Sequence, residues 1–217
     1  MTIEKGSPYG TPGPAPDDLE VAGSDADAGR VVASARRDGR PLPPVGLTGG
    51  DLSRTLGGVV TAPEQLRATT SVTYPVDLGE ALVDGRLHFF VAHLVAHTPT
   101  WSYAFVAMNA QWVGRWNAGP RAHPGDGLLD TYEARLPLSE RVKVRSRLHH
   151  GAHLPHPGIR ERRASAVQVT LPRRTRVMVD GQAVGEGRNL SVRVQPDAVR
   201  VVVASPDAVT HRREGEP

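Results

Sequence analysis

A dense run of histidines is the pattern in this sequence that most directly suggests chemistry. His149, His150, His153 and His156 lie within the short segment His-His-Gly-Ala-His-Leu-Pro-His. Imidazoles at this density can bind Zn²⁺ or Ni²⁺. The interspersed Gly151 and prolines predict a loop, so no pair of histidines is preset on one helix face. We therefore interpret the run as a solvated or structural loop and keep a metal site as the alternative.

Other patterns that carry chemistry are weak. The sequence has no Gly-x-Ser-x-Gly elbow, no Walker-type phosphate loop and no Gly-x-Gly-x-x-Gly motif, which argues against the enzymes that use them. It has no cysteine, so disulfides and thiolate metal sites are excluded. Trp101, Trp112 and Trp116 could stack on bases or line a lipid groove. We favour packing in the core or at a sheet edge for these rings.

The charge is small in sum but unevenly distributed. The net charge is +3, yet residues 140–176 contain ten Lys or Arg against two Glu. A basic half can attract phosphates, anionic lipid or nucleic acid. A solvated arginine-rich surface is the simpler interpretation. Because no aromatic-basic motif accompanies the charge, we do not favour nucleic acid as a ligand.

The elements that must position these residues change character along the chain. Residues 19–21 predict a strand, and Ser24 with Asp27 predicts a capped helix that stops near Gly39. A second glycine loop precedes a short helix that ends at residues 57–58. From residue 71 the hydrophobic period becomes two, and Asp-Gly pairs at 84–85 and 180–181 predict turns. Further strands are expected at 87–95, 103–108, 128–134, 166–171, 176–179, 190–194 and 199–203, with one helix at 139–149.

This pattern predicts an α+β, mostly β, fold: an antiparallel β-sandwich preceded by a small truncated α/β remnant. We expect a disordered tail at 1–15, the remnant at 16–62, the sandwich at 63–206 and a second disordered tail at 207–217. No secretory signal and no stretch able to span a membrane is recognised, so a cytoplasmic protein is expected.

Four segments resemble, in order, motifs of the diacylglycerol kinase and bacterial lipid kinase family, which includes the sphingosine kinases. That family has a nucleotide lobe followed by a C-terminal β-sandwich lobe. The resemblance covers about residues 19–204 and is mainly to the sandwich lobe, with a degenerate remnant of the nucleotide lobe in front. The matching segments are Gly23-Ser24-Asp25-Ala26-Asp27, Thr48-Gly49-Gly50-Asp51, Gly125-Asp126-Gly127-Leu128-Leu129-Asp130 and Val179-Asp180-Gly181-Gln182.

The departures from the family bear on activity. The front half of the nucleotide lobe has no counterpart here. Ser24 and Ala26 replace glycines that let backbone N–H groups approach phosphate, and Asp27 adds a negative charge there. Gln182 replaces the glutamate that the family uses as proton acceptor, although Asp180 could still act as a base. Losing a general base alone costs about 10²–10⁴-fold in rate.

The resemblance also implies where ligands would sit. The nucleotide-binding remnant falls on Gly23, Ser24, Asp25, Thr48, Gly49 and Asp51, and its degraded glycines argue against ATP. The base motif falls on Asp180 and Gln182, and we assign no catalytic residue with it. A structural Mg²⁺ would be held by the side chain of Asp126 and the backbone carbonyls of His123 and Leu128. An ordinary turn stabilised by Asp126 is the alternative.

Three functions follow as hypotheses. The first is a lipid-kinase-like protein that is non-catalytic alone and binds a lipid, an anionic membrane surface or a protein partner. The second is an active ATP-dependent lipid kinase, alone or completed by another chain. The third is a basic adaptor for nucleic acid. The sequence does not identify the lipid, the partner or the oligomeric state.

Overall fold

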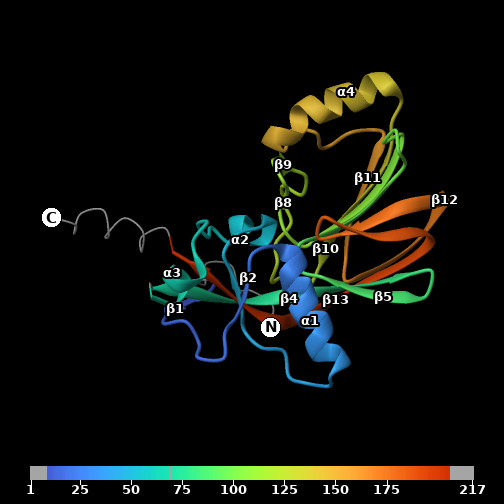
Figure 1. Ribbon diagram of the computed structural model, residues 1–217. Helices are drawn as coiled ribbons and strands as arrows, with labels where there is room; N and C mark the ends of the chain where they lie inside the picture. The colour runs from blue at the N-terminus through green and yellow to red at the C-terminus, as the bar shows by residue number, and fades with distance from the viewer. Residues whose placement is uncertain (1–8, 69, 206–217) are drawn as a thin grey trace.

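The computed structural model describes residues 9–68 and 70–205 (Figure 1). The second predicted tail and residues 1–8 of the first lie outside this part. Within the first, Thr11–Gly13 forms strand β1, which pairs with β4 and is therefore ordered, contrary to expectation.

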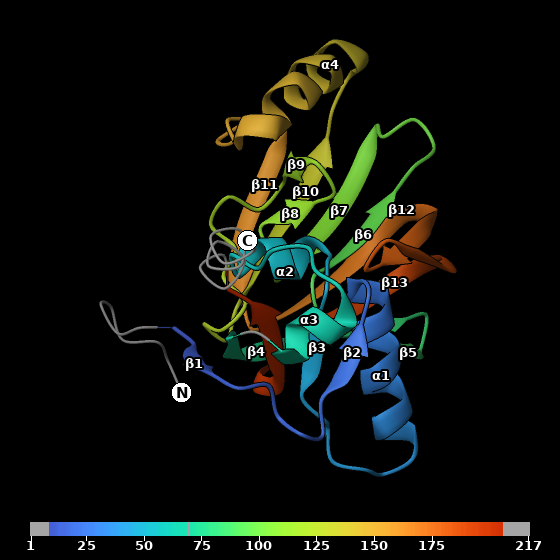
Figure 2. The same ribbon diagram turned by 60° about the vertical axis from the view of Figure 1, so that its left-hand side comes forward.

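The α/β segment contains β2 (Glu20–Ala22), α1 (Asp25–Arg37), β3 (Val45–Leu47), α2 (Asp51–Thr55) and α3 (Pro63–Ala68). Helix α1 begins as predicted, because the Ser24 hydroxyl oxygen accepts a hydrogen bond from the Asp27 N–H at 3.2 Å. Strands β2 and β3 are parallel, and β3 also pairs in parallel with β13. The α/β segment and the sandwich thus share one sheet. Figure 2 shows α1 beside β2 and β5.

The rest of the fold is the predicted antiparallel β-sandwich. Its strands follow the spatial order β1-β4-β13-β12-β6-β7-β10-β11, and β5 pairs with β4. Both predicted Asp-Gly turns are present, with positive φ at Asp84, Gly85, Asp180 and Gly181, as a tight hairpin of this kind requires. The strands are β4 (Ser71–Val83), β5 (Arg86–Phe90), β6 (His93–His97), β7 (Tyr103–Met108), β10 (Leu129–Arg135), β11 (Ile159–Ala164), β12 (Ala166–Val179) and β13 (Gln182–Ala204).

Several boundaries differ from expectation. The strand expected at 87–95 is divided into β5 and β6, because the N–H groups of residues 91–93 bind the Asp180 carboxylate instead of continuing the β4–β5 ladder. The four strands expected at 166–179 and 190–203 are two long ones, β12 and β13, with register shifts inside them. Strand β11 and helix α3 were not expected.

Helix α4 (Leu138–Arg147) and the 3₁₀ turn Leu148–His150 correspond to the predicted helix and end at Gly151, which has φ +65°. Helix α4 lies above β11 and the small ribbon of β8 (Trp112–Val113) and β9 (Trp116–Asn117) in Figure 1. One apolar cluster fills the sandwich, a second lies between α1 and the sheet, and a third lies beneath α4. Among the described residues, no helix is both long and apolar enough to cross a membrane.

Candidate functional site

Four ionisable side chains meet where the α/β segment joins the sandwich: Asp25, Asp51, His93 and Asp180. We call this group the carboxylate junction. Asp25, His93 and Asp180 are buried, and Asp51 is partly buried. They come from the N-terminus of α1, the N-terminus of α2, the start of β6 and the β12–β13 turn. Three segments that resemble lipid-kinase motifs are therefore adjacent in space.

Asp180 is held by the backbone. Its Oδ2 accepts from the Val91 N–H, and its Oδ1 accepts from the Ala92 and His93 N–H groups, each at 2.9 Å. Burial raises the pKa of Asp180, while nearby His93 and these N–H donors oppose that shift. Both carboxylate oxygens are thus engaged in closing the gap between β5 and β6.

The other carboxylates of the junction are also engaged. Asp25 accepts from the Asp51 N–H at 2.6 Å and the Leu52 N–H at 3.2 Å, so it caps helix α2. Burial, with the charge of Asp180, raises the pKa of Asp25 to about 7. Asp51 Oδ2 lies 3.0 Å from His93 Nε2 and accepts from the Gly114 N–H at 2.9 Å.

His93 and Asp51 shift each other in opposite directions. Burial alone would lower the pKa of His93, but the hydrogen bond to Asp51 and the charge of Asp180 raise it overall. Burial alone would raise the pKa of Asp51, but the hydrogen bonds from His93 and Gly114 bring it below its ordinary value. His93 was not among the predicted site residues. A histidine inside the apolar run Val-Ala-His-Leu-Val was the available signal.

The predicted nucleotide-binding remnant lies together at this junction, with its polar groups bonded to one another. A Cβ added to Gly49 would lie 3.4 Å from the Gly23 carbonyl oxygen, and the Thr48 hydroxyl donates to the Ala22 carbonyl at 3.4 Å. The Ser24 hydroxyl donates to the Asp27 carboxylate at 2.7 Å. Arg30 also pairs with Asp27, so the negative charge expected there is partly compensated.

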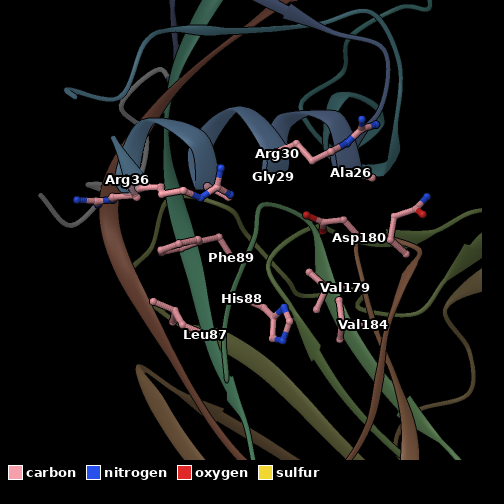
Figure 3. Close-up of a pocket in the computed structure, with 13 residues that line it drawn as sticks. Ala26, Gly29, Arg30, Arg36, Leu87, His88, Phe89, Val179, Asp180 and Val184 are labelled. Atoms are coloured by element: carbon pink, nitrogen blue, oxygen red, sulfur yellow. The ribbon is translucent and has the colours of Figure 1, made fainter. Parts of the chain in front are cut away.

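A cleft of about 870 Å³ extends from the junction along α1, and we call it the arginine cleft. Figure 3 shows Arg30 and Arg36 on the α1 side, opposite Leu87 and Phe89 of β5, with Asp180 nearby. Small residues on α1, Ala26, Gly29 and Ala33, leave room for the cleft, and Arg37 and Gln182 also line it. These arginines were not predicted as site residues, although Arg30 and Arg37 lie seven residues apart, a helical spacing.

A second cavity, of about 320 Å³, lies beneath α4, and we call it the α4 cavity. Apolar side chains of the sheet and of α4 form most of its wall, among them Val95, Ala104, Val106, Ala134, Ile159 and Val144. Trp101 and Trp116 also line it, so two of the three tryptophans face this cavity rather than a fully closed core. Trp101 additionally stacks on His97 with ring centroids 3.9 Å apart.

The predicted cation site is a tight turn with its carboxylate already paired. Asp126 Oδ1 accepts from the Leu128 N–H at 3.0 Å, and Oδ2 contacts the Arg163 guanidinium. A Mg²⁺ ion at Asp126 with the carbonyls of His123 and Leu128 would therefore compete with Arg163.

The histidine run does not gather around one point. His149 and His150 are exposed, His153 is buried, and His156 Nε2 lies 3.3 Å from Glu140. Within residues 9–68 and 70–205, no group of three or more His, Cys, Asp or Glu side chains is arranged to hold a metal ion.

Comparisons with known proteins agree with this arrangement. The family model described as "YegS C-terminal NAD kinase beta sandwich-like domain" matches residues 60–203. No curated protein matches the sequence. Two solved structures assigned as a diacylglycerol kinase from Bacillus anthracis str. Sterne are similar with TM-scores of 0.62 and 0.61. Each is 14% identical, and the match covers 88% of this chain and 79% of the other.

A third structure, of a diacylglycerol kinase from the same organism, has a TM-score of 0.56 and 16% identity, covering 88% of this chain and 76% of that one. At these identities the likeness is one of fold.

Proposed function

The chain belongs to the family of YegS C-terminal NAD kinase beta sandwich-like domains, and on this premise we propose that it binds a single lipid chain in the α4 cavity and does not transfer phosphate by itself. The observation that carries the proposal is the cavity itself. Its volume of about 320 Å³ lies at the lower end of the range for small-molecule sites, about 300–1,000 Å³. That size suits one acyl chain.

The wall of the cavity supports an apolar ligand. Sheet residues such as Val106 and Ile159 face α4 residues such as Val144 across it. Burying each CH₂ of a chain contributes about 0.8 kcal/mol without any catalytic residue. Leu138 and Val142 line the same cavity yet are 66% and 64% exposed, so its α4 edge is open to solvent and offers an entrance.

The carboxylate junction supports the absence of phosphoryl transfer. Three backbone N–H groups bind the oxygens of the buried Asp180, so this carboxylate is fixed in the break between β5 and β6 and is less available to a substrate hydroxyl. The side chain of Gln182 is an amide and accepts no proton at neutral pH. Asp25 caps α2, so the N–H groups that would bind a phosphate are already taken.

Binding is tested with two matched cavity-filling variants. Ala134→Phe places a ring in the α4 cavity, and Ala33→Phe places one in the arginine cleft. We expect Ala134→Phe to abolish displacement of a fluorescent fatty-acid probe by dodecanoic acid and Ala33→Phe to leave it unchanged. Equal displacement by the wild-type chain and by folded Ala134→Phe would contradict the proposed site.

The absence of catalysis is tested with radiolabelled ATP and four acceptors: diacylglycerol, monoacylglycerol, phosphatidylglycerol and sphingosine. We expect the purified wild-type chain to form no more product than an Asp51→Asn control. Product clearly above that control would replace this proposal with an active lipid kinase.

One observation favours that second candidate, a kinase completed by another chain. Three cationic side chains, Arg30, Arg36 and Arg37, line the arginine cleft together with Asp180. Guanidinium groups bind phosphates well, so a partner that supplied the adenine wall could make the cleft a nucleotide site. ATP binding by the wild-type chain that Ala33→Phe abolishes would support this candidate.

A further inference from the structure

The α4 cavity contains polar atoms that an unsubstituted acyl chain would leave without partners. Among the described residues, Tyr132 Oη, His153 Nδ1 and Trp116 Nε1 are buried and accept or donate no hydrogen bond. All three side chains line the cavity, as does Arg141, whose Nε is a fourth buried atom without a partner. Tyr132 and His153 are each only 6% exposed, and their rings meet edge to face with centroids 6.5 Å apart.

These three atoms differ in the kind of hydrogen-bond partner that they require. Burial lowers the pKa of His153, which favours the neutral imidazole, and the Ala118 backbone opposes that shift. A neutral imidazole has one N–H and one bare ring nitrogen, so the unpaired Nδ1 either donates or accepts, according to the tautomer. The Trp116 N–H can only donate, and the Tyr132 hydroxyl can do either.

We infer that the ligand of the α4 cavity carries a hydroxyl group on its apolar chain, placed among Tyr132, His153 and Trp116. A hydroxyl donates one hydrogen bond and accepts up to two, so it can pair with His153 Nδ1 in either tautomer, with the Trp116 N–H and with the Tyr132 phenol. The inference rests on the proposed lipid-binding function and narrows its ligand to hydroxylated acyl chains.

Other ligand groups fit less well. An ester or ketone oxygen accepts only, so it can pair with the Trp116 and Tyr132 donors but not with His153 Nδ1 in the tautomer in which that nitrogen is bare. An unsubstituted chain would leave all three atoms unpaired in an apolar site. Buried polar groups in native proteins nearly always have a hydrogen-bond partner. Several buried polar atoms without one therefore point to a ligand group that the chain itself does not contain. An ordered water could take that place instead, and it is an outcome of the test.

The test compares dodecanoic acid with its monohydroxylated isomers, the hydroxyl lying near the carboxylate, at mid-chain or at the terminal carbon. Dissociation constants are measured by calorimetry on the full chain. We expect one isomer to bind about tenfold or more tighter than dodecanoic acid, as satisfying buried hydrogen-bonding groups predicts.

Tyr132→Phe should erase most of this preference while leaving dodecanoic acid bound. Its matched control is Tyr103→Phe, which removes a buried phenol outside the cavity lining and should keep the preference. Trp116→Phe serves if Tyr132→Phe does not fold.

The possible outcomes distinguish the preference for a hydroxylated chain from lipid binding itself. If dodecanoic acid binds as tightly as every isomer, a water fills the polar site, and the inference is overturned while the proposed function stands. A preference that survives both Tyr132→Phe and Trp116→Phe overturns it as well. If no chain binds, the proposed function and the inference both fall.

Discussion

The carboxylate junction and the α4 cavity are built in opposite ways. At the junction, charged side chains come together and backbone groups bind the carboxylates: three N–H groups bind Asp180, and Asp25 caps α2, whereas His93 Nδ1 has no partner. In the α4 cavity the wall is apolar, and the few polar atoms there, such as Tyr132 Oη, remain unpaired. Both regions are buried and both contain ionisable groups, so burial alone does not distinguish them.

The difference lies in whether the chain itself completes the hydrogen bonding. Carboxylates that already accept several backbone N–H groups fix the backbone geometry and have little capacity left for a ligand. A cavity with unsatisfied groups has capacity for a partner. Under the proposed function, residues that resemble lipid-kinase motifs have a structural role, and the binding role belongs to the α4 cavity, to which Trp101, Trp116 and His153 contribute.

The largest expected effect is on stability, from Asp180→Ala at the junction. It leaves three buried N–H groups without acceptors, at about 1–3 kcal/mol each, so we expect the free energy of unfolding to fall by roughly 4 kcal/mol. Urea denaturation followed by circular dichroism measures it.

The matched control is Asp84→Ala in the other Asp-Gly turn. Asp84 also accepts from backbone, at Arg188 and Asn189, but these bonds are exposed and water can replace the carboxylate. We expect a much smaller loss. If Asp180→Ala and Asp84→Ala lowered the free energy of unfolding equally, the buried Asp180 would contribute no more stability than the exposed Asp84.

A smaller effect concerns pH. The folded pKa of Asp25 is about 7, whereas an unfolded aspartate has about 3.9. At pH values between these two pKa values, Asp25 keeps its proton in the folded chain and loses it in the unfolded chain. The stabilisation is therefore complete below about pH 4 and is lost as pH rises to about 7. The raised pKa values of Asp180 and His93 act in the same direction. The lowered pKa of Asp51 acts oppositely, at acid pH.

Asp25→Asn should flatten this dependence, because asparagine does not titrate and its carbonyl still accepts one of the two N–H groups. We expect the slope of unfolding free energy against pH, between pH 4 and 7, to fall by up to about 1.4 kcal/mol per pH unit. Urea titrations at several pH values measure the slope. An unchanged slope would mean that Asp25 is ionised throughout and that another group dominates.

The sequence was most informative where local chemistry decides structure. The Ser24 cap, both Asp-Gly turns and the sandwich class follow from short-range rules, and all are present. The strand break at residues 91–92 was not predictable in this way, because it depends on Asp180, which lies far along the chain. Strand β11 was missed since its sequence Ile-Arg-Glu-Arg-Arg-Ala has few apolar residues, as suits a strand at the end of the sheet.

The candidate sites also differ in how far short-range sequence patterns could predict them. Motif resemblance identified Asp25, Asp51 and Asp180, which the structure brings together, but it gave no sign that backbone groups occupy them. The α4 cavity is formed by residues from six strands and a helix, and apart from Trp101, Trp116 and His153 none of them belongs to a pattern that suggests a ligand. Such a cavity depends on long-range packing, which hydrophobic periodicity does not report.

The smallest expected effect on stability comes from the Asp126 turn. It tests whether the chain alone satisfies the Asp126 carboxylate or whether that carboxylate can also bind a cation. Arg163 is 47% exposed, so removing its ion pair with Asp126 in Arg163→Ala should cost no more than about 1 kcal/mol. If Mg²⁺ and Arg163 compete for the same carboxylate, Arg163→Ala should bind Mg²⁺ more tightly than the wild-type chain in a calorimetric titration at millimolar concentration. The double variant Arg163→Ala, Asp126→Asn is the control and should bind none. No binding to Arg163→Ala would make the turn purely structural, like the junction, because Leu128 N–H and the turn geometry would then account for Asp126 without a cation.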